Sequence, residues 1–147
     1  MIRDASEHDI EQIADMAMEF WKESPFDVPA DMESVTAFAE HCLSENLLCV
    51  LEIDGKLEGF AAGIKGAMPG NLNVVCGNEV AWWVNPPHRA GRNGIGLLKH
   101  IENMARDAGI RFWTMAFMQS SMPEQIEAIY QKLGYSKSEV SYTKELT

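Results

Sequence analysis

The stretch from residue 79 to residue 118 most constrains the fold. An apolar strand is expected over residues 79–84, an amphipathic helix around 97–105 and a second apolar strand over 110–118. An Asn-Pro-Pro triplet ends the first strand, because proline cannot continue a β-ladder. A strand, a helix and a second strand in this order predict a parallel crossover.

Hydrophobic periodicity predicts the remaining elements. Ser6 is expected to cap the first helix, with Asp9 completing a capping-box variant. Asp54-Gly55 predicts a hairpin turn. Strands are expected over 2–5, 47–53, 57–64, 79–84, 110–118 and 140–146, and helices over 10–21, 35–43, 97–105 and 124–133. Helices alternating with strands predict an α/β fold whose mixed sheet lies in a three-layer arrangement.

Two glycine-containing stretches are expected to lie outside regular structure. Residues 66–73 hold a proline and two glycines and are predicted to form an exposed loop. Val74 and Val75 begin a strand that Gly77-Asn78 is expected to interrupt. No linker separates domains, so a single domain over 1–147 is expected.

Composition excludes several classes of function. Of the 147 residues, 46% are hydrophobic and 23% are charged, and the net charge is -10. Such acidity argues against binding nucleic acid or anionic membranes, both of which require a basic surface. No stretch approaches the ~20 apolar residues of a membrane-spanning helix. The first residues also lack the apolar run of a signal peptide, so a cytoplasmic protein is expected.

Cysteines and histidines are too scattered to form a recognisable motif. The three cysteines contain no C-x-x-C pair, which argues against a disulfide framework or a zinc site. The four histidines add no metal-binding spacing. The sequence therefore predicts free thiols and no bound metal.

The loop after residue 84 carries the strongest chemical signal. A strand, a glycine-bearing loop and a helix start bring backbone N–H groups and the positive end of a helix dipole to one place, which suits an anion. Glycine lets a phosphate approach the backbone, although it also serves simply to make a tight turn. The loop matches neither the Walker A pattern nor G-x-G-x-x-G.

Two motifs resemble those of the GNAT acetyltransferase superfamily. Val84-Asn85-Pro86 followed by Arg89-Ala90-Gly91-Arg92-Asn93-Gly94 and Leu97-Leu98 is similar to the acyl-CoA loop of that family. Residues 128–135, Ala-Ile-Tyr-Gln-Lys-Leu-Gly-Tyr, are similar to its late A-x-x-Y-x-K-x-G-F/Y helix. The resemblance extends over essentially the whole chain. It implies a GNAT-like three-layer fold with a central mixed, mostly antiparallel, twisted sheet flanked by about four helices.

The resemblance also implies where acetyl-CoA binds. The residues implied to hold it are Trp83, Val84, Arg89, Ala90, Gly91, Arg92, Asn93 and Gly94. In the family a bulge at the end of this strand frees an amide for the thioester carbonyl, and that amide maps to Val84. Trp82 and Trp83 are expected to point to opposite faces, one of them in the core and the other in a second core layer or lining the pantetheine or acceptor groove.

Two positions depart from the family pattern. Arg92 replaces the middle glycine of the loop, which is costly if the backbone there needs a positive φ; otherwise its guanidinium could pair with a CoA phosphate. Pro123 replaces an asparagine that often contacts the cofactor. Both departures keep open a second hypothesis, a non-catalytic GNAT-fold binding or assembly module.

The resemblance assigns the chemistry to two residues. Tyr130 matches the tyrosine that protonates the leaving thiolate, and its alternative role is that of a core aromatic residue. Glu79 is the best candidate for the base that deprotonates the amine through water, although a glutamate at a strand start is more often solvated. His88 is an alternative polar group beside the loop, where a lone histidine is usually a surface residue.

The implied activity is the direct transfer of an acetyl group from acetyl-CoA to a primary amine of a small molecule or peptide. A homodimer is common in the family. There is no Asp or Glu between residues 84 and 100, whereas residues 7–31 are rich in both. This distribution keeps negative charge out of the loop sequence and suits a cationic acceptor.

Overall fold

The computed structural model describes residues 1–118 and 122–147, and the chain separates into two compact units, Met1–Ala116 and Phe117–Thr147. The strands of the first unit are β1 (Ile2–Asp4), β2 (Leu48–Ile53), β3 (Lys56–Met68), β4 (Asn71–Val84) and β5 (Phe112–Thr114). Its helices are α1 (Ile10–Lys22), α2 (Met32–Ser44) and α3 (Asn93–Asp107), with 3-10 turns η1 (Glu7–Asp9) and η2 (Pro86–His88). The second unit contains α4 (Pro123–Lys132).

The strands form one mixed sheet in the order β1-β2-β3-β4-β5. The first three pairings are antiparallel, and β4 pairs with β5 in parallel. The connection from β4 to β5 contains α3, so the predicted parallel crossover is confirmed. The Asp54-Gly55 turn between β2 and β3 is confirmed as well.

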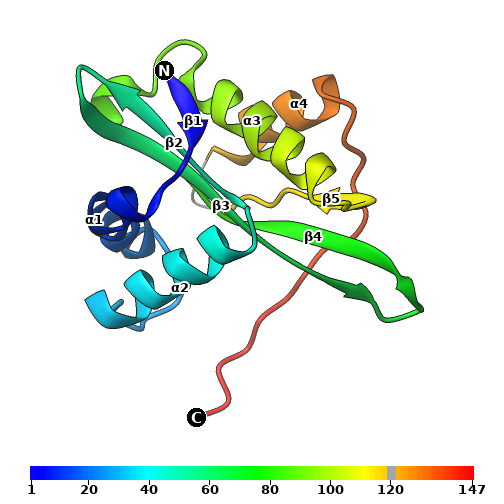
Figure 1. Ribbon diagram of the computed structural model, residues 1–147. Helices are drawn as coiled ribbons and strands as arrows, with labels where there is room; N and C mark the ends of the chain where they lie inside the picture. Colours follow the sequence, from blue (N-terminus) through cyan, green and yellow to red (C-terminus); the bar gives the residue numbers. More distant parts are fainter. Residues whose placement is uncertain (119–121) are drawn as a thin grey trace. The chain divides into compact units, whose positions relative to one another are not determined.

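Helices cover both faces of this sheet (Figure 1). On one face, Cys49 and Leu51 of β2 and Val84 of β4 pack with Leu97 and Ile101 of α3 in a common buried cluster. Leu48 and Val50 point to the opposite face because side chains alternate along a strand, and α1 and α2 pack there. The predicted three-layer α/β arrangement is confirmed for the first unit.

The glycine-rich region between residues 66 and 78 forms two long strands, so both expectations for it were wrong. β3 continues to Met68 and β4 begins at Asn71, which leaves Pro69-Gly70 as the turn. Gly66 pairs with Cys76 and Lys65 with Gly77, inside a stretch of the ladder that keeps one register from Gly63 to Ala67. A glycine costs a strand only a little stability, and pairing along the whole hairpin offsets that cost.

The last two expected strands differ from the structure. Of the strand expected over 110–118, only Phe112–Thr114 forms a strand. Residues 119–121 lie outside the described part of the chain. Residues 140–146 are irregular and largely exposed, although their sequence alternates like that of a strand. The helix expected over 124–133 corresponds to α4. No helix in residues 1–118 and 122–147 is long and apolar enough to cross a membrane.

Candidate functional site

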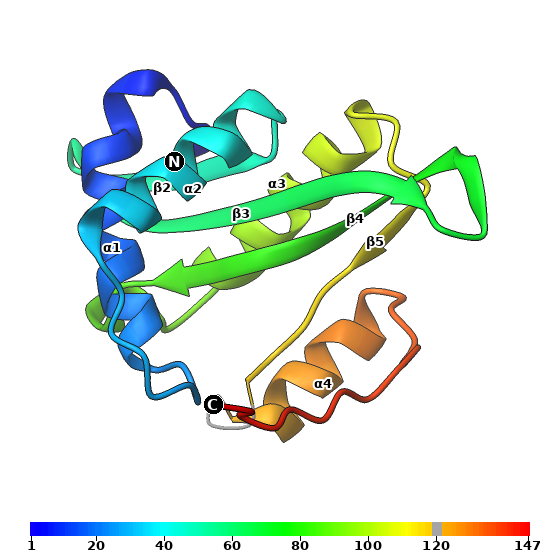
Figure 2. The same ribbon diagram turned by 90° about the horizontal axis from the view of Figure 1, so that it is seen from below.

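The open half of β4 is the central feature of the candidate site. β5 pairs with β4 only at Cys76–Asn78, so within the described ranges no strand covers residues 79–84 on that side. Figure 2 shows β5 beside β4. The part of a strand edge that its parallel neighbour does not pair with leaves backbone donors and acceptors available to a ligand.

The amide of Val84 points toward this open edge. The Asn85 N–H donates to the Glu58 carbonyl at 2.8 Å, so Asn85 bonds directly to β3. Hydrogen-bonded and non-bonded pairs alternate along an antiparallel ladder, and Val84 is opposite Gly59 in a non-bonded pair. Its N–H and C=O therefore both point away from β3. The Arg89 Nε donates to this carbonyl at 2.7 Å.

The bulge in β4 lies away from the strand end, which corrects the expectation that it would be at Val84. Ala62 pairs with Ala81 and Gly63 with Glu79, so Val80 is the extra residue. Val84 is oriented outward by ordinary alternation and needs no bulge. The extra residue also shifts the alternation, so Glu79 lies on the α3 face together with Trp82 and Val84.

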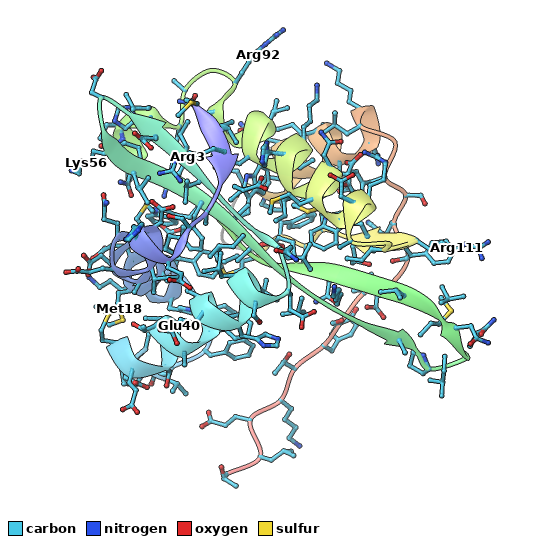
Figure 3. All side chains as sticks on the ribbon, in the orientation of Figure 1. Arg3, Met18, Glu40, Lys56, Arg92 and Arg111 are labelled. Atoms are coloured by element: carbon cyan, nitrogen blue, oxygen red, sulfur yellow. The ribbon has the colours of Figure 1, made fainter. Side chains whose placement is uncertain are left out.

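The loop after β4 combines a left-handed glycine with an open helix start. Gly91 has φ +88°, a conformation that few other residues adopt without strain. Arg92 has φ -105°, so the departure from glycine there causes no backbone strain. Arg92 is the N-cap of α3 without a side-chain capping bond, and it points away from the ribbon (Figure 3). Asn93 and Gly94 belong to the first turn of the helix.

Asn85 links the end of β4 to β3 and to the loop that follows, a role that its sequence context does not predict. Its Nδ2 donates to Glu58 Oε2 at 2.7 Å, and its Oδ1 accepts from Trp83 Nε1 at 2.8 Å. Its carbonyl accepts from the His88 N–H at 2.9 Å. The residue follows a strong strand, but its partner Glu58 is distant in the sequence, so no local pattern reveals the pair.

Acidic side chains reach the loop from other elements, which corrects the expectation that the acidic residues concentrate elsewhere. Glu58 Oε2 lies 3.7 Å from His88 Nε2, and Glu23 Oε1 lies 3.8 Å from a terminal nitrogen of Arg89. The loop sequence itself contains no acid, but the fold places two carboxylates beside it. Arg89 is thus partly neutralised by Glu23, and the His88 ring has the Glu58 carboxylate beside it.

Trp82 and Trp83 point to opposite faces, as predicted. Trp83 is buried, lies edge-on to Phe20 of α1 with ring centroids 6.4 Å apart, and carries the Arg89 guanidinium 4.5 Å above its ring. Trp82 donates from Nε1 to the Gly94 carbonyl at 2.9 Å and so ties β4 to the first turn of α3. Trp83 therefore contacts the loop through Arg89, and Trp82 contacts the start of α3 through Gly94.

Glu79 lies in the middle of β4 and not at its start, because the strand begins at Asn71, eight residues before the predicted start. Its side chain is half-buried. Burial raises the pKa of its carboxyl group to about 7, and an N–H from Ala116, 3.4 Å from Oε2, opposes that shift. A carboxyl group with such a pKa can exchange a proton near neutral pH. The sequence alone could not show this environment, and the role of Glu79 as a base remains a prediction.

Tyr130 belongs to the second unit, in α4. It is buried, and its ring centroid lies 6.3 Å from that of Phe117 and 5.6 Å from that of Tyr135. Pro123 begins the helix, where a missing N–H has no cost. These facts describe the second unit by itself, and the role of Tyr130 remains a prediction from its motif.

A hollow of about 1070 Å³ lies between α1 and α2. Four of its lining residues are acidic: Glu7, Glu11, Asp15 and Glu40. The sequence predicted acidic first helices, but the hollow depends on how α1 and α2 pack and is not visible in the sequence. Among residues 1–118 and 122–147, no group of three or more His, Cys, Asp or Glu side chains is placed to hold a metal ion.

Solved structures show which fold this is. A predicted acetyltransferase from Clostridium acetobutylicum, solved with acetyl-CoA, is 17% identical over 99% of this chain and 95% of its own, with a TM-score of 0.75. A GNAT family acetyltransferase from Staphylococcus aureus is 14% identical over 99% of this chain and 98% of its own, with a TM-score of 0.70. Glucosamine-6-phosphate N-acetyltransferase from Arabidopsis thaliana is 14% identical over 100% and 98%, with a TM-score of 0.73.

No family model and no curated protein sequence matches the chain. At these identities the structural likeness concerns the fold. The chain has the GNAT fold, as its two motifs predicted.

Proposed function

We propose that this chain is an N-acetyltransferase that moves an acetyl group from acetyl-CoA to a primary amine by direct transfer. The observation that carries the proposal is the open half of β4, where the Val84 N–H points away from β3 at the edge that β5 leaves uncovered. A backbone donor at such an edge can bind the thioester carbonyl and stabilise the negative charge that develops on it.

The loop and the start of α3 fit the diphosphate of acetyl-CoA. The first N–H groups of a helix have no partner within the helix, and Arg92 does not cap them with its side chain. Gly91 provides the positive φ of the loop and has no side chain. No atom lies within 4 Å of the position that a Cβ would take, so the space beside it is open. When bound, acetyl-CoA would supply the activated acetyl group.

Glu79 is the proposed general base. Its carboxylate would take a proton from the acceptor ammonium, directly or through water, and leave a neutral amine as the nucleophile. Tyr130 is the proposed acid that returns a proton to the leaving thiolate, on the strength of its motif. The primary amine is proposed to belong to a small molecule or a peptide, and the acidic side chains of α1 and α2 support a cationic acceptor.

Calorimetric titration with acetyl-CoA tests the proposal. Binding in the micromolar range is expected, and Gly91→Ala should weaken it about tenfold, because an alanine is strained at that positive φ. Gly66→Ala is the matched control, since Gly66 has open space around it but no positive φ. Absence of binding at millimolar acetyl-CoA would instead support the non-catalytic module.

For a binding-competent protein, Tyr130→Phe should slow transfer and leave affinity nearly unchanged.

A further inference from the structure

Two glycines on adjacent strands form a slot for one indole ring. A Cβ added at Gly63 of β3 would collide with Trp113 Cη2 and would lie 3.1 Å from its Cζ3. A Cβ at Gly77 of β4 would lie 3.1 Å from Trp113 Cε3 and 2.7 Å from Ile110 Cδ1. One edge of the six-membered ring of Trp113 therefore lies against both strands, in space that a side chain at either position would occupy.

This slot adjoins Glu79. Gly63 is the cross-strand partner of Glu79, so the two residues share a face of the sheet. Directly opposed Cβ positions in an antiparallel pair are about 5 Å apart. Gly77 precedes Glu79 by two positions on the same strand and shares that face as well. The indole thus covers the sheet at both positions that border the carboxylate.

The orientation of the indole matters as much as its place. Trp113 Nε1 donates to Met115 Sδ at 3.2 Å, so the polar edge of the ring is engaged along its own chain. The atoms next to the two glycines, Cε3, Cζ3 and Cη2, belong to the hydrocarbon edge. The part of the indole nearest the two glycines therefore has no hydrogen-bond donor to offer the Glu79 carboxylate.

Three basic groups on the surrounding elements have other partners. Lys65 of β3 lies 3.9 Å from Glu45, Arg111 before β5 stacks on Phe112 at 5.2 Å, and Arg106 of α3 lies 3.2 Å from Glu102. The raised pKa of Glu79 has burial as its cause, with the Ala116 N–H acting in the opposite direction and no neighbouring charge contributing.

We propose that Trp113 is a positioning residue for Glu79: seated on Gly63 and Gly77, its indole keeps water from the carboxylate that takes the proton of the acceptor amine. The inference rests on the proposed function for the proton transfer itself. The exclusion of water is a property of the free protein and can be measured without a substrate.

The test follows the Glu79 carboxyl signal by ¹³C NMR across a pH titration, with Glu79→Gln used to assign it. In Trp113→Phe, the shorter ring withdraws from the slot, and the pKa of Glu79 should fall by about one pH unit toward its ordinary value. Trp21→Phe removes an indole from the exposed side of α1 and should leave that pKa unchanged. An unchanged Glu79 pKa in folded Trp113→Phe overturns the inference.

Trp113→Leu provides a second variant in case the phenylalanine protein does not fold, and the same fall is expected. The pH dependence of kcat/KM then separates the two proposals. The acid limb should move to lower pH together with the carboxyl titration if Glu79 is the base. A carboxyl titration that moves while the rate profile does not would confirm the effect of Trp113 and refute the assignment of Glu79.

Discussion

Asp9 anchors the start of the first helix through a carboxylate that accepts hydrogen bonds from both Arg3 and Ser6. Arg3 donates to both of its oxygens, at 2.8 and 3.0 Å, and the Ser6 N–H donates at 2.7 Å, which confirms the predicted capping role. The hydrogen bonds from Arg3 are the main cause that lowers the pKa of Asp9 to about 2. Arg3 also donates to Glu52, so one side chain joins β1, β2 and η1.

Asp9→Asn should therefore destabilise the protein by about 2 kcal/mol at pH 7, because it leaves a half-buried guanidinium with one carboxylate fewer. A lowered pKa stabilises the fold above the ordinary carboxyl range, and that contribution is lost as the pH falls toward 2. The difference between the two proteins should shrink accordingly in urea titrations at decreasing pH. Asp15→Asn, at an exposed position on α1, should change little at any pH. Equal losses for both variants would refute this account.

Glu79 has the opposite pH dependence. Its pKa is raised to about 7, so the folded state favours the protonated form, and stability is lost as the pH rises through 7. Glu79→Gln should stabilise the protein by about 1–2 kcal/mol at pH 8 and have little effect at pH 5. Thermal unfolding at the two pH values measures this, with exposed Glu139→Gln as control. A loss of stability at pH 8 would contradict it.

At this scale the sequence could predict residue types but not environments. Ser6 and Asp9 were identified because a capping box is local. The pKa of Glu79 depends on its burial in the folded sheet, so no pattern around residue 79 contains it. The φ of Arg92 likewise became known only from the structure.

Among the elements, the pairing of β3 with β4 depends on its glycines. Gly63→Ala places a methyl group where Trp113 Cη2 lies and 3.2 Å from the Asn78 carbonyl oxygen. We expect a loss of about 1–3 kcal/mol in the free energy of unfolding, measured by urea titration. Trp113→Phe should recover part of that loss in the double variant, because the shorter ring no longer fills the slot. Additive losses would show that the two residues do not share this space.

Elements with a strong period were predicted well, and those that depend on partners were not. Residues 10–21 and 97–105 have apolar residues at helical spacing and belong to α1 and α3. Residues 66–73 contain turn-forming residues, yet their hairpin pairing decides the outcome. Residues 140–146 alternate like a strand, but an alternating segment becomes one only when a neighbouring strand accepts its hydrogen bonds.

Over the whole molecule, acidic and basic side chains are less separated than the sequence predicts. The net charge of -10 and the acid-free loop suggested separate electrostatic regions. Folding brings Glu58 and Glu23 to that loop, so His88 and Arg89 face carboxylates as well as any bound anion. Recognition of a phosphate there would depend on directed backbone N–H groups more than on net positive charge.

The two units should differ in local stability, which gives the last prediction. β2 and β3 contain long runs of buried residues, whereas within α4, all of which is described, Tyr130 is the one buried residue. Local opening free energies follow buried apolar contacts. Amide hydrogen exchange in α4 should therefore be faster than in β2 and β3, with a smaller free energy of opening. Tyr130→Ala should remove the remaining protection of α4 and leave that of β2 intact. Equal protection of α4 and β2 in the unmodified protein would show that both open only in global unfolding.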